Sequence, residues 1–422
     1  MILNLFTLSL MKWYPCFIFI FFMSAIGCGQ QTTQKQEAAS PIKQHSNNNP
    51  VETKPPNTTY NPAFEGQTRV AAIKTHTPYT VTLLATGLGR PWGMAQLPNG
   101  QFLITEKSGF IYLLDENGKQ LEKITGLPPV DHNGQGGLLG IAIDPQFEKN
   151  RIIYWSFSEA DAQGNHTAVA KGNISNDEKS IQNARVIFRA LPSLKSNLHF
   201  GSRLVFDSSG YLFVSTGERS ILEGRKQAQW LNSGLGKIFK ITKEGKPAPG
   251  NPFIKNKQAI PEMYAYGIRN AQGLAIHPQT GELWETEFGP FGGDELNIIK
   301  AGNNYGWPVI TYGLEYNGNK IGDAITQKQG MEQPVYYWDP SISPSGCSFY
   351  SSNLIPEWQN NLFIGCLSGQ HIIRLQLQNN KVTGEERLLT DKNERFRDVL
   401  ASANGALYSI TDSGKFIKIS KQ

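Results

Sequence analysis

A glycine-rich acidic turn, GPFGGDE, occupies residues 289–295. Gly289, Gly292 and Gly293 carry no Cβ atom, so main-chain carbonyl groups can crowd around one point there. Asp294 and Glu295 place carboxylates beside those carbonyls. Such oxygens are hard donors that suit Ca²⁺, and the chain has no Cys/His spacing typical of zinc. The turn therefore predicts a calcium site, and a solvated acidic loop between strands is the alternative.

A histidine and several arginines occur just before strand-like segments. His199, in SNLHFGSR, can accept a proton near neutral pH, although a lone histidine in such a place is more often structural. Arg269, followed by Asn270, offers a planar fork for carboxylate or quinone oxygens. Arg395 and Arg397 have period-two spacing, so their like charges face one side of a strand and call for an anion between them. Together these residues predict a flat, anionic, carboxylate-bearing ligand near a Ca²⁺ ion.

One hairpin pattern recurs along the chain: an apolar strand, a turn rich in Pro, Asn, Asp or Gly, and a second apolar strand. Six copies at irregular spacing indicate blades with variable insertions, and flanking strands complete them. The pattern predicts an all-β fold, a six-bladed β-propeller with four-stranded antiparallel blades around a central channel. A pair of β-sandwiches is the alternative, but it does not explain the recurrence. The copies are Trp92–Glu106, Leu138–Phe157, Arg203–Glu218, Gln272–Glu287, Gly346–Cys366 and Arg397–Asp412.

The innermost strands of a propeller converge, and loops at one end form the ligand site. Polar residues just before each inner strand should therefore gather at one mouth. Arg203 either shares this mouth or pairs with an acid. The residues at these points are Gln135, His199, Arg203, Arg269, Asn270, Arg395 and Arg397.

Composition agrees with this fold and excludes one class of partner. The 422 residues include 42 Gly and 24 Pro, and 11% are aromatic, which favours many short strands joined by turns. Charged residues make up 18%, and the net charge of +5 is spread along the chain without a run of basic residues. Nothing here calls for nucleic acid.

The N-terminus has the features of a lipoprotein signal. Met11-Lys12 begins a basic region, and the apolar run 13–26 is too short to span a membrane comfortably. Small residues then precede Cys28, as in a bacterial lipobox, so residues 1–28 are predicted to be a signal peptide ending at a lipidated Cys28. An ordinary secretory signal or an uncleaved anchor is the alternative. We expect a periplasmic protein held on a membrane by its acyl chains.

Residues 29–75 are rich in Gln, Asn, Thr and Pro and contain few large apolar side chains. They are predicted to form a disordered tether before a propeller domain at 76–422. Cys347 and Cys366 form either a disulfide or two buried free thiols.

From about Tyr79 to Lys418, the chain resembles the bacterial PQQ-dependent soluble aldose sugar dehydrogenases of the glucose/sorbosone dehydrogenase group. The motifs that carry the resemblance are RPWGMA, GQGGLLGIAIDPQF, HFGSRLVFDSSGYLFVSTGE, YGIRNAQGLA, GPFGGDELN, NNYGWP, LFIG and RFRDV. The resemblance implies a six-bladed propeller that holds pyrroloquinoline quinone (PQQ), a planar tricarboxylate quinone, together with Ca²⁺ in its central mouth.

The resemblance also implies roles for residues in these motifs. His199 would be the general base, and Arg269 would stabilise charge on the quinone oxygen. The PQQ contacts would come from Gln135, Arg269, Asn270, Tyr316, Arg395 and Arg397. Calcium would be bound by the carbonyls of Gly289 and Pro290, by Glu295 and by the main chain of Tyr305.

Three positions depart from the family pattern. Ser368 stands where the family has a lysine aimed at a PQQ carboxylate, and it can donate a hydrogen bond but carries no charge. Phe288 and Phe291 replace a histidine and an arginine, which makes the mouth more apolar near the calcium turn.

The implied reaction is oxidation of an aldose at C1 to a lactone, with hydride transfer to PQQ and reoxidation by an external electron acceptor. A non-catalytic propeller that binds glycans or proteins at the same mouth is the main alternative. His199 beside Arg269, Arg395 and Arg397 argues against it, because a pure binder needs no base next to an anion cradle. A hydrolytic lactonase would need several carboxylates converging on the metal, where this chain concentrates arginines.

Overall fold

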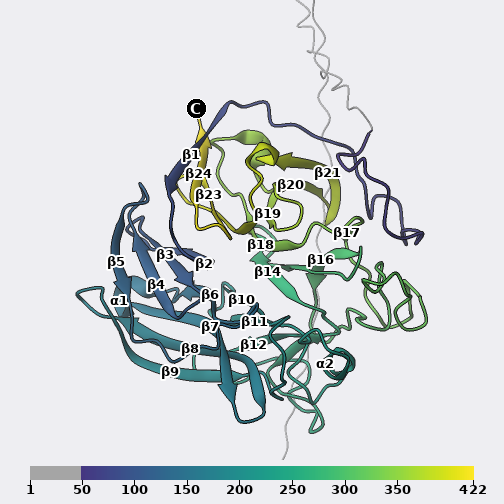
Figure 1. Cartoon of the computed structure of the whole chain (residues 1–422), viewed down its shortest axis with the longest axis horizontal. Helices are drawn as coiled ribbons and strands as arrows, with labels where there is room; N and C mark the ends of the chain where they lie inside the picture. Colours follow the sequence, from purple (N-terminus) through teal and green to yellow (C-terminus); the bar gives the residue numbers. More distant parts are fainter. Residues whose placement is uncertain (1–48) are drawn as a thin grey trace, which may run out of the picture. The chain divides into compact units, whose positions relative to one another are not determined.

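Residues 49–422 are described by the computed structural model, and they form six four-stranded antiparallel sheets around a common axis (Figure 1). The first strand of each sheet is innermost and contacts the first strands of the two neighbouring sheets, so the ring is closed. Each of the six hairpins expected from the sequence forms the two inner strands of one blade. The predicted six-bladed β-propeller is therefore confirmed.

The first three blades follow one another along the chain. Blade 1 contains β2 (Pro91–Gln96), β3 (Phe102–Glu106), β4 (Phe110–Leu114) and β5 (Gln120–Ile124). Blade 2 contains β6 (Leu138–Ile143), β7 (Ile152–Asp161), β8 (Gly164–Ile174) and β9 (Ile181–Arg189). Blade 3 contains β10 (Gly201–Phe206), β11 (Leu212–Thr216), β12 (Lys237–Ile241) and β13 (Met263–Tyr266).

The last blade takes its outer strand from the start of the domain. Blade 4 contains β14 (Ala271–Ile276), β15 (Leu283–Glu287), β16 (Asp294–Ile299) and β17 (Tyr336–Trp338). Blade 5 contains β18 (Pro344–Phe349), β19 (Leu362–Cys366), β20 (Ile372–Gln378) and β21 (Lys381–Leu388). Blade 6 contains β22 (Phe396–Ala401), β23 (Leu407–Thr411), β24 (Phe416–Lys421) and β1 (Tyr79–Ala85), and the pairing of β1 with β24 closes the ring. Short helices lie in the connections: α1 (Phe147–Asn150), α2 (Leu222–Gln227), η1 (Pro356–Trp358) and η2 (Thr390–Lys392).

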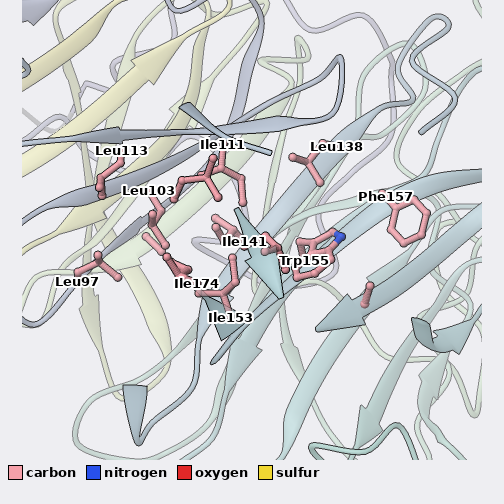
Figure 2. Close-up of a cluster of buried hydrophobic side chains, with 14 of the residues drawn as sticks. Leu97, Leu103, Ile111, Leu113, Leu138, Ile141, Ile153, Trp155, Phe157 and Ile174 are labelled. Carbon is pink, nitrogen blue, oxygen red and sulfur yellow. The ribbon is translucent and has the colours of Figure 1, made fainter. Parts of the chain in front are cut away.

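Apolar layers between neighbouring blades form the core. Figure 2 shows the layer between blades 1 and 2, where Leu103 and Ile111 of blade 1 belong to the same buried cluster as Ile141, Ile153 and Trp155 of blade 2. Burying one such side chain contributes about 1.5–3 kcal/mol. Equivalent layers join the other blades and fix their order around the axis.

A repeated hydrogen bond links the second strand of one blade to the inner strand of the next. Each inner strand has a register shift near its first residues. In four blades, a hydroxyl of the second strand then donates to a carbonyl of the next blade's inner strand, over 2.5–3.0 Å. These hydroxyls belong to Thr105, Ser156, Ser215 and Thr286. The first three also accept an inner-strand N–H of their own blade, so polar groups near the shifts remain paired.

A buried ion pair joins several blades at the axis. Arg203 of β10 donates to Asp398 of β22 over 2.7 Å, and its Nε donates to the carbonyl of Gln272 on β14. Asp398 also accepts the N–H of Met94 on β2. Of the two expectations for Arg203, pairing with an acid is the one that the structure shows.

The segment before β1 is ordered from residue 49 onward. Thr58 donates from its N–H and hydroxyl to Asp339, and Gln67 is buried and donates to the carbonyl of Pro334. Ala72 bridges to Glu385 of β21. The polar groups of residues 49–75 therefore find partners on blades 4 and 5, so this part of the predicted tether contacts the propeller. Residues 29–48, the predicted signal peptide and Cys28 lie outside the described residues.

Cys347 and Cys366 are buried free thiols, so the second of the two alternatives for them is correct. Within residues 49–422, no helix has the length and hydropathy that a membrane crossing requires.

We expect Asp398→Ala to lower the free energy of unfolding by about 3–5 kcal/mol, because it leaves the Arg203 guanidinium buried without its partner. Urea denaturation measures this loss. Asp391→Ala, which removes an exposed carboxylate of η2, is the matched control and should cost little. A loss below about 1 kcal/mol for Asp398→Ala would contradict the structural role given to the pair.

Candidate active site

A cavity of about 440 Å³ opens at the end of the propeller where the inner strands begin. This volume lies in the range of small-molecule sites. Trp92, Leu139 and Phe200 pack together and give the cavity an apolar surface, and Phe288 and Leu367 extend it. Four cationic side chains and one carboxylate also line it: Arg90, Lys107, Arg395, Arg397 and Asp412. The cavity therefore combines flat apolar surface with an excess of positive charge.

His199 lines this cavity and is held by three contacts. Its Nδ1 lies 2.6 Å from Oε1 of Glu218, and its N–H donates to Oε1 of Gln135 over 2.8 Å. Its carbonyl accepts the N–H of Arg219. The backbone of His199 adopts φ +49°, a left-handed conformation that only surrounding structure can maintain in a non-glycine residue. With Nδ1–H bound to the carboxylate, Nε2 carries the lone pair.

The surroundings keep His199 neutral. The whole residue is only 5% exposed, and burial is the main cause that lowers its pKa from 6.5 to about 4, followed by the positive charge of Arg269. Glu218 opposes this shift. Because the unfolded chain takes up a proton near pH 6.5 and the folded chain only near pH 4, the stability from neutral His199 is present above about pH 6.5 and is lost as pH falls to about 4. At neutral pH the imidazole can therefore accept a proton from a bound hydroxyl.

Arg269 and Asn270 are buried and are not among the lining residues of this cavity, and Arg269 instead lines a second, smaller cavity. Their main-chain N–H groups both donate to Oε2 of Glu287, which fixes the pair. Nη1 of Arg269 donates to the carbonyls of Phe288 and Gly289. Nε of Arg269 and Nδ2 of Asn270 are buried donors without a partner in the described structure. Such orphaned donors are rare, and they fit oxygen atoms of a ligand.

Arg395 and Arg397 line the cavity as expected, and both bind one carboxylate of the protein. Nε of each guanidinium donates over 2.8 Å to one oxygen of Asp412, and Nη2 of Arg397 adds a third bond. The anion expected between the two arginines is therefore present as a side chain of the protein itself. Asp412 ends the same hairpin and supplies the anion.

Asp294 organises the glycine-rich turn through hydrogen bonds, so its carboxylate is not free. Asp294 accepts the N–H groups of Gly289, Ile342 and Ser343, each over 2.7 Å. A side chain at position 289 would overlap the carbonyl of Gly293, so only glycine fits there. Asp294 thereby joins blade 4 to the start of blade 5 and leaves metal binding to other groups.

The four residues expected to bind calcium come together around a second cavity of about 10 Å³, which is large enough for one small ion or water. Within residues 49–422, no three His, Cys, Asp or Glu side chains are grouped as a ready metal site. A cation here would thus need main-chain oxygens as well. The hydroxyl of Tyr305 is bound to Ile298 and Lys300, which leaves its main-chain carbonyl as the donor for a metal. The four residues are Gly289, Pro290, Glu295 and Tyr305.

Two buried acids, Glu287 and Glu295, line this second cavity together with Arg269. They lie directly opposite each other in the β15–β16 ladder, and Glu285 is two residues from Glu287. Burial is the main cause that raises the pKa of all three acids, and the charge of Glu287 adds to the shift of Glu285 and Glu295. Oε1 of Glu285 and Oδ1 of Asn297 are buried acceptors without a partner in the described part of the chain. Opposed carboxylates and orphaned acceptors are what a bound cation would stabilise.

Two further candidates occupy different positions. Tyr316 lines the large cavity with 73% of its surface exposed, and the neighbouring Glu315 forms an ion pair with Arg225 of α2. Ser368 donates or accepts one hydrogen bond with Ser343 at 2.8 Å, and it is Ser343 that lines the cavity. Ser368 thus reaches the mouth only through its neighbour.

Sequence reasoning missed Glu218, Asp412 and Lys107 as members of the site. The sequence did contain a signal for Glu218 and Asp412. In four repeats, the second strand either ends in a carboxylate or is followed by one within two residues. These residues are Glu106, Glu218, Glu287 and Asp412. Repeats place equivalent residues at equivalent points, so four acids at the mouth could have been expected.

The geometry defines a propeller with a neutral His–Glu pair in a cationic axial cavity, and the sequence model of the family "Glucose / Sorbosone dehydrogenase" matches residues 88–418. The chain belongs to this family. It is 42% identical over 345 residues to aldose sugar dehydrogenase YliI of Escherichia coli (strain K12), and the match covers 81% of this chain and 92% of that protein.

Solved structures agree. The soluble aldose sugar dehydrogenase of Escherichia coli in its apo form is similar at TM-score 0.78 and 40% identity, over 82% of this chain and 100% of that one. The PQQ-bound aldose sugar dehydrogenase of Streptomyces coelicolor matches at TM-score 0.65 and 28% identity, over 82% and 99% of the two chains.

We expect His199 to remain neutral down to about pH 4 in a ¹⁵N NMR titration of the imidazole. Glu218→Gln should lower this pKa further, because the carboxylate charge that favours the imidazolium is removed. Glu223→Gln, on the exposed side of α2, is the control and should leave the titration unchanged. A His199 midpoint near 6.5 would show that the imidazole is not desolvated as described.

Proposed function

We propose that this protein is a PQQ-dependent aldose sugar dehydrogenase that oxidises aldoses at C1 to lactones. The observation that carries the proposal is the His199–Glu218 pair, which presents a neutral base to a cation-lined cavity beside Arg269. Family membership and the PQQ-bound relative support the same activity.

The residues present fit PQQ, a planar tricarboxylate. Four cations against one carboxylate leave an excess of positive charge on the cavity wall. The aromatic surface of Trp92 and Phe200 suits a flat ring system. Nε of Arg269 and Nδ2 of Asn270 are free to donate to ligand oxygens. When bound, PQQ would supply the oxidant that takes up the hydride of the sugar.

His199 acts as the general base in this proposal. Its Nε2 takes the proton of the C1 hydroxyl, while Glu218 holds the ring through Nδ1 and stabilises the imidazolium that forms. Arg269 stabilises negative charge that develops on an oxygen beside it. The apolar surface of Trp92, Leu139 and Phe200 excludes water from the reacting groups.

Calcium is part of the proposal. Gly289, Pro290, Glu295 and Tyr305 would hold it at the second cavity, with the buried acids of β15 and β16 adding negative charge. Ca²⁺ would supply Lewis acidity beside Arg269.

The proposal also covers the compartment and the electron acceptor. We include in the proposal a periplasmic location and a lipid anchor at Cys28, supported by the lipobox-like SAIGC sequence. An external electron acceptor would reoxidise the cofactor.

Titration of the purified domain with PQQ in excess Ca²⁺ should give a saturable change in the cofactor's absorbance, which bleaches when the correct aldose is added. An aldose panel in the same cuvette ranks substrates. His199→Ala should retain PQQ binding but lower kcat by about 10²–10⁴-fold, because only the base is lost. Wild-type protein that fails to bind PQQ would overturn the proposal and favour a propeller that only binds glycans or proteins.

Removal of the Glu295 carboxylate should weaken Ca²⁺ binding by the PQQ-free protein by at least tenfold, because a charged ligand is lost. Isothermal titration calorimetry with CaCl₂ compares wild type with Glu295→Gln. The control is Glu116→Gln, which changes an exposed carboxylate. Equal Ca²⁺ affinity of wild type and Glu295→Gln would remove Glu295 from the metal site.

A further inference from the structure

Lys107 is a partly buried ammonium group at the cavity that has no carboxylate partner. It follows the last residue of β3, and its Nζ donates to the carbonyl of Gly134 over 2.6 Å. Within residues 49–422 it forms no ion pair. Burying a charge without a counterion is costly. The position therefore carries an electrostatic cost that the fold alone does not offset.

The groups around Lys107 increase this cost. Burial is the main cause that lowers its pKa to about 8, and the charges of Arg90 and Arg397 lower it further. The nearest acids, Glu106 and Asp412, oppose the shift only in part.

Both acids are engaged elsewhere. Glu106 accepts the N–H of Arg90, together with the N–H and hydroxyl of Ser108. Asp412 is shared by the guanidinium groups of Arg395 and Arg397.

Arg90 completes the arrangement. Its side chain is exposed, lines the same cavity, and has no ion pair in the described part of the chain. The carbonyl of Arg90 accepts the N–H of Lys107, so the two residues are fixed to each other through the main chain. Lys107 and Arg90 thus leave two uncompensated positive charges on blade 1, whereas Arg395 and Arg397 share the carboxylate of Asp412.

We propose that Lys107 and Arg90 form a carboxylate subsite that binds one carboxylate of PQQ from blade 1. The inference deepens the proposed function and rests on it. An ammonium and a guanidinium that converge on one space are suited to a carboxylate. The subsite also explains how a chain with uncharged Ser368 on blade 5 holds an anionic cofactor: the charge comes from another blade.

The test measures PQQ binding to the PQQ-free protein in excess Ca²⁺ by quenching of tryptophan fluorescence, without substrate. Lys107→Gln should raise the Kd by about 10- to 100-fold, and Arg90→Gln should raise it in the same direction. Lys119→Gln, which neutralises an exposed lysine of blade 1, is the matched control and should bind as wild type does. Since Arg90 is exposed, its variant keeps the test valid if Lys107→Gln is unstable.

A pH series separates a charge effect from a packing effect. Wild-type affinity should fall as pH rises above about 8, because Lys107 then loses its proton. Lys107→Arg should keep its affinity in that range, since arginine stays charged.

The two proposals fail in different ways. Absence of PQQ binding by the wild type overturns the proposed function. Wild-type binding that is unchanged in Lys107→Gln and Arg90→Gln overturns the subsite and leaves the function standing. A change confined to the KM for the aldose would likewise overturn it, because the charge would then serve the substrate.

Discussion

The buried ion pair between Arg203 and Asp398 is the contact on which the rest of the propeller depends. It joins β10 to β22, and the same two side chains bind main-chain groups of β2 and β14. A fifth blade contributes Gly346, where any side chain would overlap Asp398. The guanidinium of Arg203 also lies 4.5 Å from the ring of Trp92, whose indole lines the cavity. The axis of the fold and the apolar surface of the site are therefore one packed unit, which keeps the site on rigid strands.

One repeated position is used differently in each blade that carries it. The carboxylates Glu106, Glu218, Glu287 and Asp412 lie at the end of the second strand of their blades or one or two residues beyond it. Glu106 binds main-chain N–H groups, Glu218 orients the imidazole of His199, Glu287 fixes the main chain of Arg269, and Asp412 holds two arginines. Symmetry of the fold thus supplies the acids, and the partner that each blade offers determines the role.

The sequence predicted the fold well because the hairpin pattern is local: period-two alternation and turn residues act within about twenty residues. Of the residues expected to gather at one mouth, four line the cavity, namely Gln135, His199, Arg395 and Arg397. The other three, Arg203, Arg269 and Asn270, are not among its lining residues. What it could not predict were contacts set by ring closure. The pairing of Arg203 with Asp398 and the docking of residues 49–75 on blades 4 and 5 depend on which distant segments meet. Composition alone made that segment resemble a tether, although Gln67 and Thr58 are buried in specific hydrogen bonds.

In the proposed function, positive charge near the cavity affects two requirements that would otherwise conflict. A base must be neutral to accept a proton, yet an anionic ligand requires cations nearby. In the proposed function Arg269 meets both needs, because its charge lowers the pKa of His199 while its Nε has no partner within the described residues. Its guanidinium lies 5.0 Å from the ring of Trp307, and Arg225 lies 5.3 Å from the same ring. Since Arg225 pairs with Glu315, the loop that carries Tyr316 is connected to Arg269 through one aromatic side chain. Arg269, beside His199, and Glu315, beside Tyr316 of the cavity wall, are accordingly connected by cation–π contacts to Trp307 and by the ion pair of Arg225.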